Sequence, residues 1–187
     1  MDQPAIREAI RSILTAVGED PGRPGLEATP DRIARMYEEV LGGIGQDPGD
    51  GLRRDLRRGV RRTHPPAGHP ALLLCEHHLL PFTGKAHVVY VPNDKGQITG
   101  LSKLARVVDV ASRQPQVQER LTVQVADALS TRLEPKGVIV VIEAEHLCMA
   151  MRGIRKPCAA MVTSVVRGAI RRNVATREEA MRLIRET

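Results

Sequence analysis

Hydrophobic residues recur every three or four positions in the first forty residues, which is the spacing of one face of an α-helix. Between residues 3 and 17 this stripe consists of Ile6, Ile10, Ile13 and Leu14. A second helix is predicted from Thr29-Pro30-Asp31, where Thr29 would be the N-cap and the proline and acid would occupy the first turn. It should end near Leu41, before two glycines. The pattern therefore predicts two N-terminal helices.

The periodicity changes after residue 70. Residues 71–76 and 83–92 have the short, valine-rich pattern of strands, residues 101–113 and 115–133 that of helices, and residues 137–144 and 157–166 that of two further strands. Thr176 and Glu179 have the spacing of a capping box, which predicts a short final helix. The order β-β-α-α-β-β favours an α+β fold with an antiparallel sheet.

These patterns divide the chain into three parts. We expect an N-terminal helical region over residues 1–50, a connector over 51–70 and a catalytic domain over 71–187. The connector is rich in Gly, Pro and Arg. Its arginines could be a solvated surface or an anion-binding patch, and they are Arg53, Arg54, Arg57, Arg58, Arg61 and Arg62.

Charge and composition narrow the class of partner. The formal net charge is +6, which favours an anionic ligand. Only three aromatic residues are present (Tyr37, Phe82 and Tyr90), too few for base-stacking platforms, so we expect no nucleic-acid partner. The longest apolar run, residues 138–142, is far shorter than the roughly 20 residues of a membrane helix, and the N-terminus lacks the apolar core of a secretory signal. We therefore expect no membrane partner and a cytoplasmic location.

Two Cys/His motifs lie at predicted strand ends. Cys75 and His78 are three residues apart, and Cys148 follows the strand that begins at Gly137. Two cysteines and one histidine are the protein ligands of a catalytic zinc site, which keeps its fourth position for water. The alternative is that these cysteines are buried small residues. Cys158, between a proline and two alanines, is expected to pack inertly.

Two further histidines, His77 and His146, adjoin these predicted ligands. Zinc lowers the pKa of bound water from ~15.7 towards ~7, and a histidine can donate or accept protons near neutral pH. Together they predict a hydrolase with several proton transfers.

A possible anion site lies on the helix that begins near Leu101. Ser102, Lys103 and Arg106 share the face opposite its apolar stripe, and Arg152 follows Cys148 closely. Such side chains could bind a polyphosphate or could form solvated surfaces. In the next helix, Glu119 lies on a second apolar stripe, where a semi-buried carboxylate would need a partner. A guanine edge or a neighbouring arginine would serve equally well.

Several long segments resemble the GTP cyclohydrolase I family. They are CEHHLLPFTGKAHVVYVP, GLSKLARVVDVASRQPQVQERLT and EAEHLCMAMRGI, with ATPDRIARMYEEVLGG near the N-terminus. The resemblance implies a tunnelling fold assembled as a toroid, a decamer of two pentamers with active sites between subunits. It also implies conversion of GTP and water to 7,8-dihydroneopterin triphosphate and formate, the first step of pterin and folate (or deazapurine) biosynthesis.

The resemblance also implies individual roles. Cys75, His78 and Cys148 match the ligands of one Zn²⁺ per subunit, and His77, His146 and Ser102 match proton-transfer residues. Residues that match the family's contacts to the triphosphate, ribose and guanine are Lys103, Arg106, Arg152, Gln118 and Glu119.

Three other functions are compatible with parts of the pattern. An RNA-binding module would have a closed, four-ligand structural zinc site. A regulatory relative would have lost the catalytic cluster. A tunnelling-fold nitrile reductase would use a nucleophilic cysteine and no zinc.

Overall fold

The computed structural model describes residues 1–52, 56–57 and 69–186, and the chain divides into two compact units, Met1–Gly42 and Gly43–Thr187. Most of the predicted connector, with the side chains of its arginine run, lies outside the described residues. The predicted domain boundaries at residues 50 and 70 therefore stay predictions. Among the described residues, no helix is both long and apolar enough to cross a bilayer.

The first unit is a pair of helices, α1 (Gln3–Ala16) and α2 (Thr29–Val40), as predicted. An ion pair joins them, with Arg7 Nε 2.5 Å from Asp31 Oδ1. The predicted N-cap of α2 is wrong. Ala28 occupies the cap position, and Thr29 is already helical, with its hydroxyl 3.5 Å from the carbonyl oxygen of Gly25. The proline that follows Thr29 does lie in the first turn.

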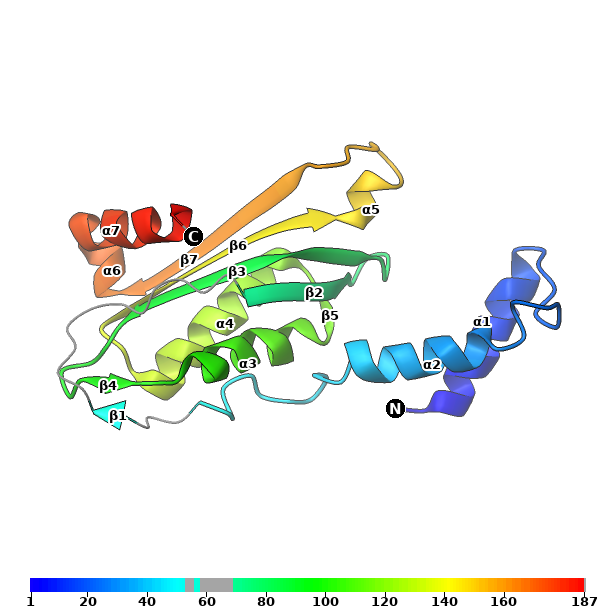
Figure 1. The fold of residues 1–187 in the computed structure, drawn as a ribbon, viewed down its shortest axis with the longest axis horizontal. Coiled ribbons are helices and arrows are strands. Elements are labelled where there is room, and N and C mark those ends of the chain that lie inside the picture. The colour runs from blue at the N-terminus through cyan, green and yellow to red at the C-terminus, as the bar shows by residue number, and fades with distance from the viewer. Residues whose placement is uncertain (53–55, 58–68, 187) are drawn as a thin grey trace. The chain divides into compact units, whose positions relative to one another are not determined.

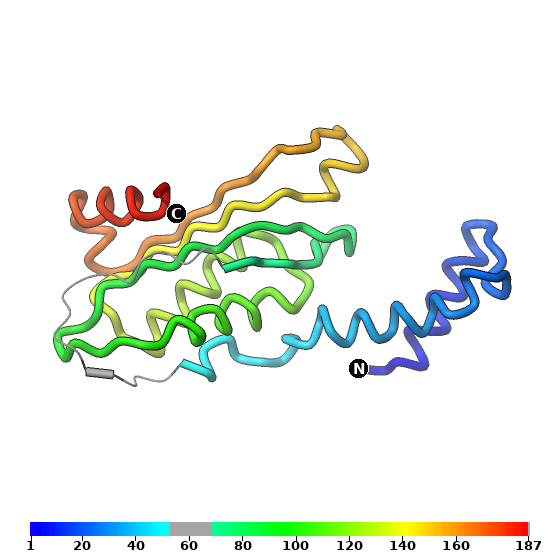
Figure 2. Tube along the Cα trace, in the orientation of Figure 1, coloured from blue at the N-terminus to red at the C-terminus, as the bar shows by residue number. Residues whose placement is uncertain are grey.

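The second unit is built on a five-stranded sheet (Figures 1 and 2). Its spatial order is β5-β2-β3-β6-β7, and every neighbouring pair is antiparallel except the short parallel pair β2–β5. The strands are β2 (His69–Cys75), β3 (Pro81–Val91), β5 (Pro115–Gln116), β6 (Gly137–His146) and β7 (Ala160–Gly168). A separate antiparallel pair is formed by β1 (Leu56–Arg57) and β4 (Gln97–Ile98).

Helices cover both faces of this sheet (Figure 1). The larger core packs α3 (Leu101–Ser112) and α4 (Gln118–Leu133) against one face. The smaller core packs α6 (Ala169–Arg172) and α7 (Val174–Arg185) against the other. Because β6 is buried from both sides, its apolar residues run continuously and do not alternate with polar ones. The predicted α+β class and the β-β-α-α-β-β order are confirmed.

Some local predictions fail in this unit. The capping box at Thr176 is wrong, because α7 begins earlier and Asn173 Oδ1 accepts its cap hydrogen bond from Thr176 N at 3.1 Å. Cys158 does not pack in a strand; it is exposed, with a φ of 63°, just before β7. Glu119 is exposed within one chain, and Val123 on the same predicted stripe is 38% exposed, so burial of this stripe against another subunit stays a prediction. Within one chain, therefore, α4 buries mainly one face.

Candidate active site

The first half of the site is the tight turn between β2 and β3. Cys75 ends β2, and its carbonyl accepts hydrogen bonds from the amides of His78 (3.3 Å) and Leu79 (2.8 Å), while its own amide donates to Leu80 O. Leu79 adopts a φ of 52°, which closes the turn. The chain reverses so tightly that Cys75 Sγ and His78 Nδ1 lie 4.0 Å apart.

The second half comes from the end of β6. The β3–β6 register pairs Phe82 with His146, and Cys148 follows in the short helix α5 (Leu147–Ala150). This register brings Cys148 beside the β2–β3 turn, although 70 residues separate the two motifs in the sequence. The ligand atoms of Cys75, His78 and Cys148 all lie within 4.8 Å of one another.

This cluster fits a tetrahedral metal ion. Zn–S bonds of about 2.3 Å and Zn–N bonds of about 2.0–2.1 Å would place ligand atoms roughly 3.5–3.8 Å apart. The observed separations are 4.0 Å between Cys75 Sγ and His78 Nδ1 and at most 4.8 Å for any pair, so they exceed the ideal values by at most about 1.3 Å. Cys75 is buried, Cys148 is half-buried and His78 is exposed, so one side of the cluster faces solvent. Such an arrangement leaves room for a water molecule or a substrate atom as the fourth ligand.

The electrostatics of the cluster also favour a cation. Burial raises the pKa of the Cys148 thiol, and the neighbouring Cys75 raises it further. A second negative charge beside Cys75 is unfavourable, so the Cys148 thiol is held protonated unless a positive charge lies next to it. A divalent ion supplies that charge, and its binding therefore releases protons.

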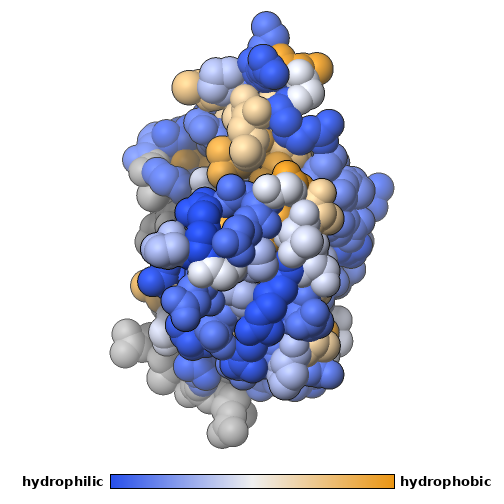
Figure 3. Space-filling view, turned by 90° about the vertical axis from the view of Figure 1, so that its right-hand side faces the viewer, coloured by the Kyte–Doolittle hydropathy of each residue, from blue (hydrophilic) through white to orange (hydrophobic). Residues whose placement is uncertain are grey.

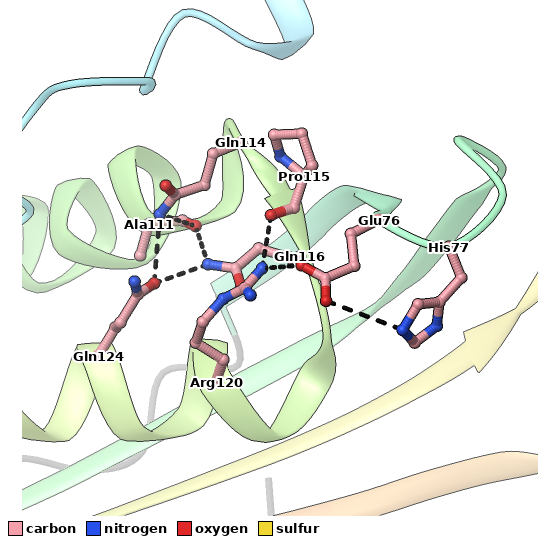
Figure 4. A network of polar contacts seen from close by, with 8 residues as sticks. All are labelled: Glu76, His77, Ala111, Gln114, Pro115, Gln116, Arg120 and Gln124. Atoms are coloured by element: carbon pink, nitrogen blue, oxygen red, sulfur yellow. Dashed lines mark hydrogen bonds and ion pairs between the residues drawn. The ribbon is translucent and has the colours of Figure 1, made fainter.

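A polar network supports the turn from behind (Figure 4). Arg120 donates to Glu76 Oε2 at 2.5 Å, to Pro115 O at 2.7 Å and to Gln116 Oε1 at 3.0 Å. Glu76 Oε1 lies 3.7 Å from His77 Nε2, so the exposed His77 ring is next to a carboxylate that Arg120 fixes. The network begins in the core, where Gln116 is fully buried.

His146 is held from two sides. Its ring stacks on Phe82, with centroids 4.4 Å apart and planes 6° from parallel. Its Nε2 lies 2.8 Å from Gln118 Oε1. Burial lowers the pKa of His146, while the carboxylate of Glu119 raises it. The imidazole is therefore kept neutral mainly by its surroundings and lies within the influence of Glu119.

The residues predicted to bind substrate fall into two groups. Arg152 is at the cluster, where its Nη1 contacts His78 Nε2. Gln118 and Glu119 are at the start of α4, next to His146.

The second group, Ser102, Lys103 and Arg106, lies in the N-terminal half of α3. The end of α3 precedes β5, which pairs with Cys75, but Ser102 is ten residues further back, about 15 Å along the helix axis (Figure 1).

The geometry agrees with comparisons to known proteins. The sequence model described as GTP cyclohydrolase I matches residues 6–185. Similar curated proteins are named GTP cyclohydrolase 1. That of Thermobifida fusca is 57% identical, with 98% of this chain and 89% of the relative covered. The protein of Carboxydothermus hydrogenoformans is 55% identical, with 98% of this chain and 95% of the relative covered. That of Desulforamulus reducens is 54% identical, with 98% of this chain and 97% of the relative covered. This chain belongs to the GTP cyclohydrolase I family.

Sequence reasoning missed two supports of this GTP cyclohydrolase I site. Phe82 is the only phenylalanine of the chain, and it follows the β2–β3 turn directly; that position could have marked it as a partner of the site. Arg120, in the first turn of α4, bonds Gln116 at the end of β5, but the link of both residues to Glu76 depends on the β2–β5 pairing. No local pattern reveals that pairing.

Proposed function

We propose that this chain is a zinc-dependent GTP cyclohydrolase that converts GTP and water to 7,8-dihydroneopterin triphosphate and formate. The observation that carries the proposal is the Cys75–His78–Cys148 cluster, open to solvent on one side, in a chain matched to the family over almost its whole length. The product would enter pterin and folate biosynthesis or a deazapurine pathway.

The three ligand residues would hold one Zn²⁺ per subunit. A zinc ion there would supply Lewis-acid activation of water for hydrolysis at neutral pH. The protein supplies a rigid frame, because Cys75 ends β2 and Cys148 lies in α5, the short helix that follows β6 directly.

The two histidines beside the cluster suit different proton transfers. His77 is exposed and accompanied by Glu76, so it can exchange protons with solvent. His146 is half-buried and stacked on Phe82, so its protonated form can give a proton to a ring nitrogen at a fixed place. Ser102 would be a further relay in the sugar rearrangement.

Substrate recognition would combine cationic side chains, which bind the triphosphate, with one carboxylate, which binds the guanine. Arg152, at the mouth of the cluster, and Lys103 and Arg106, on α3, would bind the triphosphate. Glu119 is exposed beside His146, where its carboxylate could accept hydrogen bonds from the ring N–H and amino group of guanine.

Assembly would complete the site. Since α3 places its triphosphate residues away from the cluster of its own chain, a neighbouring chain's α3 is the natural source of these residues. The sheet favours such contacts: β7 pairs only with β6 among the described residues, and β2 pairs with β5 only at Leu74 and Cys75. Unpaired strand edges promote pairing between chains.

Exposed apolar side chains also favour association between chains. Leu72 on β2 is 60% exposed and Val162 on β7 is 61% exposed. Beyond the cluster, Met151 and Ile154 are 61% and 67% exposed. Hydrophobic side chains gather near the top of Figure 3, at the height that α5 and the β6–β7 connection occupy in Figure 1. We propose a homo-oligomer, a toroidal decamer of two pentamers, which sedimentation can test.

The decisive experiment is incubation of the zinc-loaded protein with GTP, followed by oxidation and measurement of pterin fluorescence and formate. Arg152→Ala should weaken GTP binding far more than guanosine binding, whereas Arg155→Ala, three residues away, should affect neither. A protein that binds generic RNA but releases no formate would be the RNA-binding module. A protein that keeps full turnover after chelation would exclude the zinc mechanism.

A further inference from the structure

The side-chain amide of Gln118 has a fixed orientation. Gln118 is 1% exposed, and its Nε2 lies 2.9 Å from the carbonyl oxygens of both Ile142 and Met161 and 3.2 Å from Thr163 Oγ1. A backbone carbonyl can only accept a hydrogen bond, so the group that faces these two oxygens must be the NH₂. The reversed amide would place oxygen against oxygen and leave buried acceptors unpaired, at about 1–3 kcal/mol each.

This orientation determines which nitrogen of His146 carries hydrogen. With its NH₂ committed to β6 and β7, Gln118 presents Oε1 to His146 Nε2 at 2.8 Å. An amide oxygen accepts only, so Nε2 must donate. A neutral imidazole carries one N–H, which leaves the lone pair on Nδ1.

The ring has little freedom to escape this bond. The Phe82 ring stacks on the imidazole, with the two ring centroids 4.4 Å apart and the planes nearly parallel. This stacking opposes tilting of the imidazole. The backbone of His146 is the last pair of the β3–β6 ladder, opposite Phe82. Rotation that broke the bond to Gln118 would also leave Oε1 unpaired in a buried place.

We propose that Gln118 is a positioning residue, which keeps a hydrogen on His146 Nε2 so that Nδ1 is the ring atom that exchanges a proton with the substrate. The functional part of this inference rests on the proposed function. A proton taken up at Nδ1 gives an imidazolium whose Nε2–H still donates to Gln118. The same hydrogen bond therefore serves before and after proton transfer, and the ring need not turn.

This role differs from the guanine contact that the family resemblance implies for Gln118. A guanine contact requires an amide that faces the substrate, whereas this amide is turned towards two strands of its own chain. The neighbouring Glu119 is exposed and remains the residue suited to guanine.

The first test measures the tautomer directly in the wild-type, zinc-loaded protein without substrate. Solid-state NMR of protein labelled with ¹³C,¹⁵N-histidine distinguishes protonated from unprotonated ring nitrogens, and His146→Asn identifies the His146 signals by their absence. We expect a protonated Nε2 and an unprotonated Nδ1. The opposite tautomer would overturn the proposal, whatever the protein does with GTP.

The second test separates positioning from guanine binding. Gln118→Leu should lower kcat by roughly 10²-fold, at the low end of what general acid–base catalysis contributes, with little change in the KM for GTP. A raised KM with unchanged kcat would instead make Gln118 a guanine contact. Thr122→Val is the matched control, since Thr122 is fully buried one turn further along α4 and bonds Gln118 O and Thr163 but not His146.

Thr122→Val should lose stability but keep the tautomer and kcat. Should Gln118→Leu fail to fold, the wild-type spectrum decides alone. If wild-type protein shows the Nε2–H tautomer but releases no formate, the proposed function fails while the assignment of the hydrogen bond stands.

Discussion

Gly84→Ala should disturb both the fold and the site, because Gly84 lies where β3 and β6 approach most closely. A Cβ at this position would lie 1.9 Å from Glu143 O and 2.6 Å from Ala144 Cα. Real Cβ contacts essentially never fall below 3.0 Å, so the two strands must separate by about 1 Å or more. Neither neighbour is a side-chain end that can swing away.

The expected cost follows from that separation. Overpacking typically costs about 1–3 kcal/mol, and loss of one ladder hydrogen bond adds about 1 kcal/mol. A destabilisation of about 3 kcal/mol would lower Tm by about 6–12 °C for a chain of this length. Because Gly84 pairs with Ala144, two positions from the Phe82–His146 pair, the ring stack at 4.4 Å should loosen as well.

Thermal unfolding followed by circular dichroism measures the first effect, and formate release at a temperature well below Tm measures the second. Gly22→Ala is the control, since its Cβ would meet only the side-chain oxygen of Asp20 at 3.3 Å. That change should stay within about 1 kcal/mol of wild type. Equal Tm values for Gly84→Ala and Gly22→Ala would refute the claim that the β3–β6 spacing is fixed.

Three further predictions concern the metal, the base and pH. Cys148→Ser should lose bound zinc and formate release together, whereas Cys158→Ser, at an exposed position, should keep both. Metal analysis that finds zinc in Cys148→Ser would exclude Cys148 as a ligand. Glu119→Gln should weaken GTP binding roughly 5- to 150-fold and narrow its advantage over ITP, which lacks the amino group, as titration with either nucleotide would show. Burial lowers the pKa of His87 from 6.5, Lys85 lowers it further, and Glu143 opposes the shift. The Nδ1 atom of His87 has no hydrogen-bond partner among the described residues. As the pH falls, His87 is therefore protonated in the unfolded chain before it is protonated in the folded chain. The free energy of unfolding should then fall as the pH drops below about 6.5, by at most about 1.4 kcal/mol per pH unit. Denaturant unfolding of His87→Leu should show a flatter dependence.

Local sequence patterns predict most of the residues proposed for the chemistry and most of the element types. The spacing of Cys75 and His78 predicts that both side chains can reach one ion across a tight turn, but this pair alone is a weak signal of a metal site. The alternation after residue 70 and the helix periodicity determine element types, because burial of one face acts on each segment separately. The α+β class follows from their order.

Tertiary structure decided how these pieces act together. The β3–β6 register brings Cys148 to the turn 70 residues away and places Phe82 on His146. Local pattern cannot give register, since a shift by two residues would leave the same faces buried. The helix starts also differ from the local pattern: α2 begins without a side-chain cap hydrogen bond, and α7 is capped by Asn173, three residues before Thr176.

The orientation of Gln118 shows the difference most clearly. In the sequence it is one polar residue before Glu119, and the family resemblance gives both the same task. In the structure, two carbonyl oxygens from β6 and β7 turn its amide inward, and the remaining oxygen meets His146. A side chain with both donor and acceptor takes its role from whichever partners surround it. The sequence determined that an amide stands there, and only the packing of two strands against α4 decided what that amide does.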